Sequence, residues 1–169
     1  MILKITTPVV ALSPEAVAGR RVEISGTVYT ARDAVIPRLA RLIQNETVNN
    51  LNINLQGAAI MHAAVSPSGF GPTSSNKEEI ESNMGILSQA GVRIHMGKGA
   101  LSRETVEKIS EYRAVYITVP PVSALLQNRL ISKSVVAFQE QGMEAMYALE
   151  VQGLPGIIAA ADNCSLFNP

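Results

Sequence analysis

Apolar and polar positions along the chain alternate in a way that predicts strands at both ends and strands mixed with helices in the middle. Short runs rich in β-branched and apolar residues are typical of buried strands. They predict strands at 22–30, 58–61, 116–119, 135–138, 145–151 and 156–161, the last two separated by Gln152-Gly153-Leu154-Pro155.

Helical spacing of apolar residues predicts three helices. The clearest covers 76–90 and is followed by Gly91, where a C-terminal cap belongs. A second helix is predicted over 102–112, beginning at the capping residue Ser102, and a third over 123–131. This order of elements predicts an α/β fold with a mixed sheet or two sheets.

Length and charge restrict the possibilities further. The chain has 169 residues, of which 47% are hydrophobic, and no linker or repeat, so a single domain over 1–169 is expected. The formal net charge is +0, which argues against nucleic acid or an anionic membrane as a partner. The N-terminal segment does not resemble a signal peptide and no stretch is apolar enough to span a bilayer, so a cytoplasmic location is expected.

Cysteine content limits metal chemistry. Cys164 is the only cysteine, so the chain cannot form an internal disulfide or bind zinc or an iron–sulfur cluster through its own thiolates alone. No metal-binding residues are predicted, and Cys164 itself is interpreted as a small packing residue.

The first candidate site is the segment TVYTARDA at 27–34, where a strand ends in an Arg-Asp pair. One interpretation is a capping box between Thr30 and Asp33, with the regular helix beginning only at Pro37. The other is that Arg32 offers a planar, two-pronged donor to a substrate carboxylate while Asp33 orients it. The motif alone leaves both open.

The second candidate site is FGPTSSNK at 70–77, just before the clearest helix. A capping box of Ser75 with Glu78 explains most of it. Alternatively, free backbone N–H groups and hydroxyls at a helix N-terminus form an anion site. The residues that would form that site are Gly71, Thr73, Ser74 and Lys77.

The third candidate site is MGKGA at 96–100, between a strand and a helix. Lys98 is predicted to project into a cleft at the strand ends, where ligands of α/β proteins usually bind. Convergence of Arg32, Lys77 and Lys98 would suit a small dicarboxylate. His62 and His95 are interpreted as partly buried strand residues rather than ligands or bases, so the chain resembles half of an active site.

Several motifs occur in an order that resembles one protein family. They are ITTPV, GTVYTARDA, GPTSS, GKG, GMEAMYALEV and LPGIIAAAD. Together they resemble the β subunit, or C-terminal domain, of class I fumarate hydratases and L(+)-tartrate dehydratases, over nearly the whole chain.

The resemblance implies a fold and an assembly. The implied fold is a swivelling β/β/α domain with a mixed central sheet, a second smaller sheet and flanking helices. The implied partner is an α subunit that holds a [4Fe-4S] cluster on three cysteines, one iron of which acts as a Lewis acid on the substrate hydroxyl. This chain alone would bind no cofactor, and a homodimer or an α2β2 assembly is expected.

The resemblance also implies residue roles. Arg32 would bind a substrate carboxylate with support from Asp33, Thr73 would be the candidate proton-transfer group, and Lys98 would add charge stabilisation. The implied activity is a hydro-lyase, active only with its α subunit, that adds or removes water on a small dicarboxylate of the fumarate/malate, tartrate or mesaconate type.

Three positions depart from the family pattern. Lys77 stands where the family usually has arginine, Ile36 where a histidine is common, and Pro120-Pro121 where a glycine pair is usual. These departures indicate either a different substrate or a non-catalytic paralogue that keeps the fold as a binding or assembly subunit.

Overall fold

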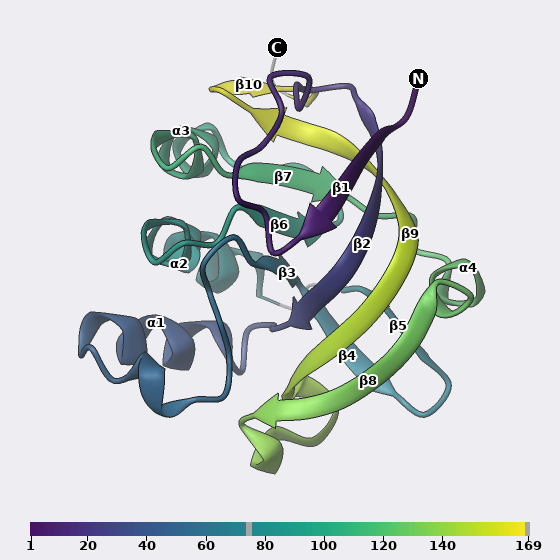
Figure 1. Cartoon of the computed structure of the whole chain (residues 1–169). Helices are drawn as coiled ribbons and strands as arrows, with labels where there is room; N and C mark the ends of the chain where they lie inside the picture. The colour runs from purple at the N-terminus through teal and green to yellow at the C-terminus, as the bar shows by residue number, and fades with distance from the viewer. Residues whose placement is uncertain (74–75, 168–169) are drawn as a thin grey trace.

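The structure, a computed structural model, describes residues 1–73 and 76–167 (Figure 1). Its strands are β1 (Leu3–Thr7), β2 (Arg21–Thr30), β3 (Ala59–Met61), β4 (Ala63–Ser66), β5 (Gly69–Pro72), β6 (Ile94–Gly97), β7 (Val115–Thr118), β8 (Leu130–Ala137), β9 (Met146–Ala161) and β10 (Cys164–Ser165). Its helices are α1 (Ile36–Gln44), α2 (Lys77–Gln89), α3 (Arg103–Glu111) and α4 (Ser123–Gln127), with 3-10 turns η1 (Val48–Asn50) and η2 (Gln139–Glu144).

The main sheet is mixed and curls back on itself. Strands β1, β2, β3, β6 and β7 pair in parallel in that order. The long strand β9 runs antiparallel to β2 along one edge and to β8 and then β7 along the other. The pairings β2–β3, β3–β6, β6–β7, β7–β9 and β9–β2 therefore form a closed ring, and β4 and β5 form a separate small hairpin sheet.

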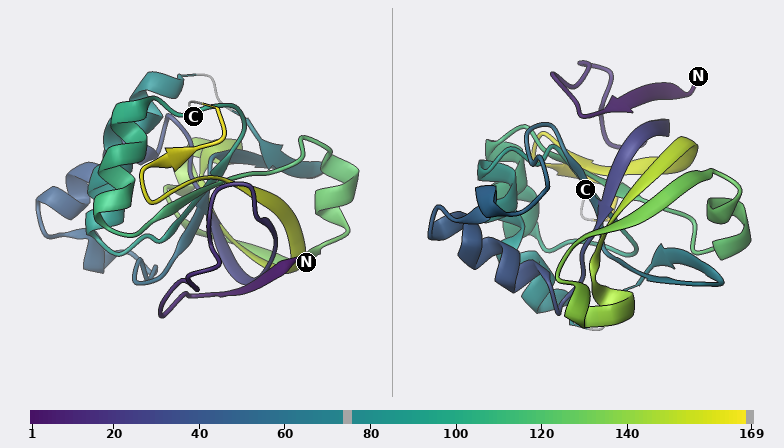
Figure 2. Two further views of the ribbon diagram at one scale, coloured as in Figure 1. Left: turned by 90° about the horizontal axis from the view of Figure 1, so that it is seen from above. Right: turned by 60° about the horizontal axis from the view of Figure 1, so that its bottom comes forward.

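Helices α1, α2 and α3 lie together on one side of the main sheet, whereas α4 and the β4–β5 hairpin lie on the other (Figures 1 and 2). Successive side chains of a strand point to opposite faces of the sheet, so the apolar side chains form two separate cores, one on each face. In β3, Ala59 and Met61 belong to one buried cluster, whereas Ile60 packs in the cluster that the helices cover. The predicted α/β class with a main sheet and a second small sheet is confirmed.

Most predicted elements are present, but two predictions near the C-terminus are wrong. The predicted helix over 123–131 ends at Gln127, and Leu130 already belongs to strand β8. The two predicted strands at 145–151 and 156–161 form one continuous strand, β9. The predicted helix over 76–90 is confirmed as α2, and Gly91 follows it with a φ of +123°.

Gly26 in β2 supports the first prediction, which concerns stability. Its φ is +108°, and a Cβ at this position would lie 2.3 Å from the backbone oxygen of Thr7 in the paired strand β1. We expect Gly26→Ala to lower the free energy of unfolding by about 3 kcal/mol, because the substitution adds both backbone strain and a backbone clash. Urea unfolding measures this change.

Gly85 in α2 is the matched control for Gly26. A Cβ at this position would meet only the side chain of Lys108, at an ordinary 3.5 Å. Gly85→Ala is therefore expected to raise stability by up to about 1 kcal/mol, since alanine favours the helix interior. Equal effects of the two substitutions would contradict the close approach of β1 to Gly26.

Candidate functional site

A cleft of about 720 Å³ gathers three of the predicted site residues, Arg32, Thr73 and Lys98. Arg32 lies two residues after the end of β2, whereas Thr73 and Lys98 come directly after β5 and β6. A fourth predicted site residue, Gly71 of β5, also lines the cleft, as does Pro121 beyond β7. The expectation that separate strand ends bring these groups together is confirmed for these residues.

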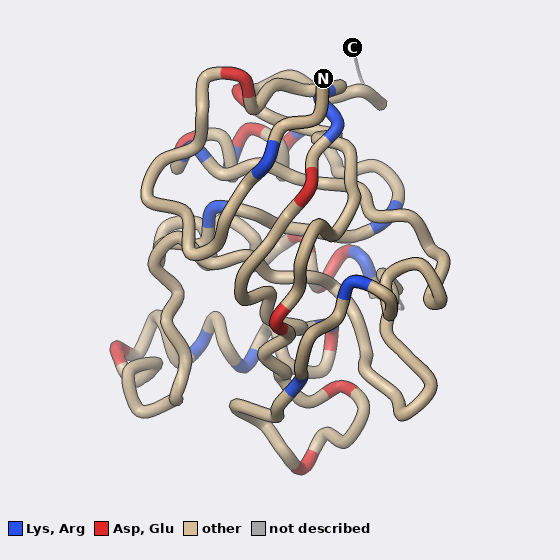
Figure 3. The backbone as a smooth tube through the Cα atoms, turned by 45° about the vertical axis from the view of Figure 1, so that its right-hand side comes forward, with Lys and Arg blue, Asp and Glu red and all other residues tan. Residues whose placement is uncertain are grey.

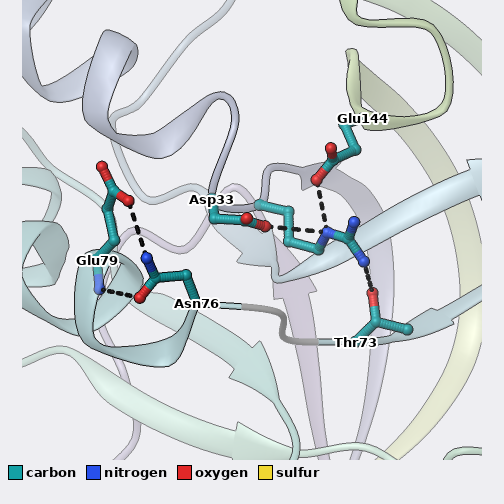
Figure 4. A network of polar contacts seen from close by, with 6 residues as sticks. Asp33, Thr73, Asn76, Glu79 and Glu144 are labelled. Carbon is teal, nitrogen blue, oxygen red and sulfur yellow. Dashed lines mark hydrogen bonds and ion pairs between the residues drawn. The ribbon is translucent and has the colours of Figure 1, made fainter.

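Arg32 is the centre of a polar network (Figure 4). Its Nε donates to Oε1 of Glu144 at 2.7 Å and lies 3.2 Å from Oδ1 of Asp33. Its Nη1 donates to the hydroxyl oxygen of Thr73 at 2.8 Å. The Arg32 and Glu144 side chains are 19% and 28% exposed, so the guanidinium is largely shielded yet still borders the cleft.

The alternative interpretation of this segment, a capping box of Thr30 with Asp33, is wrong. The Thr30 hydroxyl accepts a hydrogen bond from the backbone N–H of Tyr147 at 3.1 Å, across the β2–β9 pair. Helix α1 begins at Ile36, one residue before the expected start at Pro37, and its first turn has no side-chain cap. Pro37 is tolerated because the first helical turn has no N–H partner to lose.

Thr73 lies between the β4–β5 hairpin and helix α2. Its backbone N–H donates to the backbone oxygen of His62 at 2.9 Å. The cap of α2 is Asn76, whose side-chain oxygen accepts from the N–H of Glu79 while its amide donates to the Glu79 carboxylate (Figure 4). The predicted box of Ser75 with Glu78 is thus displaced by one residue. Ser74 and Ser75 lie outside the described residues.

Lys98 and Lys77 have different surroundings. Lys98 lines the cleft, and its backbone oxygen accepts a hydrogen bond of 3.0 Å from the hydroxyl of the buried Tyr116. Gly97 leaves room for this contact, because a Cβ there would lie 3.0 Å from that hydroxyl oxygen. The Lys77 ammonium instead donates to the backbone oxygen of Ala100, and Lys77 is not among the residues that line the cleft.

His62 and His95 are more deeply buried than predicted. Their rings lie 6.3 Å apart, and His95 Nε2 is 2.7 Å from the hydroxyl oxygen of Ser88. Burial, and secondarily the charge of Lys77, lowers the pKa of His62 to about 4. Burial, and secondarily His62, lowers the pKa of His95 to about 3. Both imidazoles are therefore neutral at pH 7.

The two buried histidines predict that stability falls with acidification. The unfolded chain binds their protons near pH 6.5, whereas the folded chain resists protonation until about pH 4 and pH 3. Between pH 6.5 and 4.5, the free energy of unfolding should therefore fall as the pH falls, by roughly 1 kcal/mol per pH unit for each histidine. Urea titrations across this range measure the slope, and His62→Gln and His95→Gln should each reduce it. An unchanged slope in both variants would contradict the burial of these rings in a neutral form.

Glu144 was not predicted as a site residue, although it contacts Arg32 and lines the cleft. It is the last residue of the 3-10 turn η2 and lies 112 positions from Arg32 along the chain. Its segment forms part of the motif GMEAMYALEV, which is the only sequence signal that could have drawn attention to it.

The described residues do not supply a metal centre. Within 1–73 and 76–167, no group of three or more His, Cys, Asp or Glu side chains could hold a metal ion. Cys164 lies in β10 and is exposed, so its interpretation as a packing residue is wrong. A cluster bound through cysteines does not fit this chain's own donor set.

Two further observations concern the distribution of charged residues and the length of the helices. In the view of Figure 3, basic and acidic positions are interspersed over the described part of the backbone. None of the helices in the described residues has the length and hydropathy needed to cross a membrane.

Comparison with known proteins identifies the family. The family described as Fumarase C-terminus matches residues 11–168. The chain is 27% identical to the L(+)-tartrate dehydratase subunit beta of Escherichia coli, over 94% of this chain and 82% of that protein. It is 28% identical to a putative L(+)-tartrate dehydratase subunit beta of Methanocaldococcus jannaschii, over 86% of this chain and 79% of that protein.

Longer relatives match over only part of their length. The chain is 25% identical to fumarate hydratase 2 of Leishmania major over 85% of its residues, but it spans only 26% of that protein. Since the match to the family covers nearly all of the sequence, the chain belongs to the fumarase C-terminus family, whose relatives include fumarate hydratases and tartrate dehydratase β subunits.

Proposed function

We propose that this chain is the β subunit of a hydro-lyase and supplies the carboxylate-binding part of its active site. The substrate class is a small dicarboxylate of the fumarate/malate, tartrate or mesaconate type. The main support is the cleft in which Arg32, Thr73 and Lys98 meet, each from a different strand end. The names of the relatives, which are fumarate hydratases and tartrate dehydratase β subunits, agree with this chemistry.

The Arg32–Thr73 contact suggests how a proton moves. Hydration of a double bond adds the hydroxide of a water molecule to one carbon and a proton to the next, and the proton that the water gives up restores the group that donated. Because the Thr73 oxygen accepts from Arg32, its own hydrogen is free to be donated toward the cleft. The guanidinium would stabilise the deprotonated oxygen after donation, and the reverse step would return the proton to it. Lys98 would stabilise negative charge that develops on the substrate carboxylate.

The iron–sulfur cluster belongs to the partner in this proposal. A [4Fe-4S] cluster on three cysteines does not fit the described residues of this chain, which offer one exposed thiol. We therefore assign the cluster to an α subunit and derive no step of the reaction through it. The subunit names of the tartrate dehydratase relatives support a partner of this kind, and a homodimer or an α2β2 assembly is the expected form.

A second candidate function is a non-catalytic binding or assembly subunit. Two observations favour it. Arg32 already contacts two carboxylates, Asp33 and Glu144, and the Lys77 ammonium is bound to the backbone oxygen of Ala100. The positive charge available to a dianion is therefore smaller than the sequence predicts.

Co-expression with a cognate α subunit under anaerobic conditions tests the proposal. The purified complex should hydrate fumarate or mesaconate, or dehydrate malate or tartrate, as followed by the absorbance of the double bond. A complex that assembles and contains its cluster, yet turns over none of these compounds, would favour the non-catalytic subunit instead.

A further inference from the structure

Glu144 lies in the cleft without a role in the proposed chemistry. It approaches Arg32 from the turn between β8 and β9, whereas Asp33 and Thr73 belong to the N-terminal half of the chain (Figure 4). Nothing in the reaction requires a second carboxylate beside the residue that should bind the substrate carboxylate. Its contact with Arg32 nevertheless determines which donors of the guanidinium remain available.

An arginine guanidinium can bind a carboxylate through either of two edges. One edge uses Nε with a terminal nitrogen, and the other uses the two terminal nitrogens. The single hydrogen of Nε is directed to Glu144 at 2.7 Å, with Asp33 at 3.2 Å from the same nitrogen. The Nε edge is therefore occupied.

The two terminal nitrogens of Arg32 have a single hydrogen-bond partner among the described residues. Nη1 carries two hydrogens, one of which is donated to Thr73, and no described residue accepts a hydrogen bond from Nη2. A carboxylate bound at this edge would lie next to the Thr73 hydroxyl. Bound at the Nε edge instead, it would lie on the side of Glu144, away from the group that moves the proton.

We propose that Glu144 is a positioning residue, which holds Nε of Arg32 so that the substrate carboxylate binds end-on through Nη1 and Nη2 beside Thr73. This inference rests on the proposed function and specifies how its substrate is held. Glu144 is positioned by the short turn η2, which follows Phe138 with its φ of +54° and contains Gly142 with a φ of +60°.

Two substitutions at Glu144 test the inference in the complex of the full chain with its α subunit. Glu144→Ala removes the acceptor of Nε, so the guanidinium is no longer oriented. We expect the dissociation constant for the dicarboxylate, measured by calorimetry, to rise about tenfold, in line with the loss of about 1.4 kcal/mol. Glu144→Gln keeps an amide oxygen that accepts from Nε, so it should restore affinity to within a few-fold of the unsubstituted complex.

The rescue by glutamine separates positioning from other roles. If Glu144 instead competes with the substrate for Arg32, both variants should bind the dicarboxylate more tightly, which would overturn the inference. If Glu144→Ala and Glu144→Gln weaken dicarboxylate binding equally, the inference is also overturned. That result would mean that the negative charge of Glu144 matters, and not the acceptor that orients Nε of Arg32. Glu140→Ala is the matched control, since Glu140 lies in the same turn, pairs with Arg38 and does not line the cleft.

The same measurements distinguish this inference from the proposed function. If the complex binds the dicarboxylate and Arg32→Ala abolishes binding while Glu144→Ala does not change it, only the role of Glu144 is wrong. If the unsubstituted complex binds no dicarboxylate, both are wrong. Should Glu144→Ala fail to fold, the inference still fails if Glu144→Gln binds as weakly as Arg32→Ala.

Discussion

Replacing Arg32 by alanine is expected to lower kcat/KM of the assembled enzyme by about 10³-fold, equivalent to about 4 kcal/mol. The substitution removes the charge-assisted donor of the cleft and the contact with Thr73, and it leaves the carboxylates of Asp33 and Glu144 without their cation. The loss should appear in both KM and kcat, because the guanidinium binds the substrate carboxylate throughout and also stabilises the Thr73 oxygen once it has given up its proton.

Arg32→Lys should recover only part of this loss. A lysine ammonium supplies charge but not the planar pair of donors that matches a carboxylate. Arg38→Ala is the control, because Arg38 is only partly buried, pairs with Glu140 and packs over the ring of Phe138 outside the cleft. Steady-state kinetics with each variant complex provides the measurement. An Arg32→Ala complex with activity within a few-fold of the unsubstituted one would contradict a carboxylate-binding role.

Thr73→Val is expected to lower kcat by about 10²-fold or more while KM changes little. Valine has nearly the shape of threonine but no hydroxyl, so the proton-transfer group is lost while the cleft keeps its volume. Thr73→Ser keeps the hydroxyl and should restore most of kcat. These kinetics are measured with the assembled enzyme, together with Tm to confirm that the variant is folded.

Isotope exchange gives a second measurement at Thr73. In deuterated water, the unsubstituted complex should exchange the carbon-bound hydrogen of the hydrated substrate for deuterium, and Thr73→Val should slow this exchange to the same extent as kcat. Exchange at the unsubstituted rate in Thr73→Val would show that another group transfers the proton, and the assignment of Thr73 would then be wrong.

Local sequence patterns predict some elements well because local physics determines them. Helix α2 has a regular apolar face and a glycine after its end, and its predicted bounds are off by one residue at each end. The helix predicted over 123–131 is present as α4 but ends at Gln127, so its C-terminal part was wrong. Residues from Leu130 onward pair with the open edge of β9, so a distant strand overrides the local helical pattern.

The break predicted within β9 was also wrong for a tertiary reason. Gly153 and Pro155 are typical strand breakers. In the structure, β8 pairs with β9 only up to Val151 and β7 pairs with it only from Ile157, so one edge has no partner strand in between. A proline can be accommodated there because its missing N–H interrupts no ladder on that edge.

The residues of the candidate site also differ in how far the sequence predicts their positions. The positions of Arg32 and Lys98 could be predicted because each follows a strand of the main sheet, and strand ends of α/β sheets tend to meet. Thr73 instead follows β5 of the small hairpin, where no strand was predicted, and only its place before helix α2 indicated a site. Glu144 could not be predicted, since it lies in the turn between β8 and β9. That turn is distant from Arg32 in the sequence and reaches it only because β9 pairs with β2. The same holds for Lys77, whose local position suggests a cleft residue but whose ammonium reaches Ala100.

Strand β9 also has a consequence for the order of folding. It begins at Met146, yet it completes a ring whose first member, β2, begins at Arg21. During synthesis, β2 and β7 therefore both emerge before the strand that pairs with each of them, and β2 does so more than a hundred residues earlier. Pairings between such distant segments have a high entropic cost of loop closure, which makes this topology intrinsically slow to assemble.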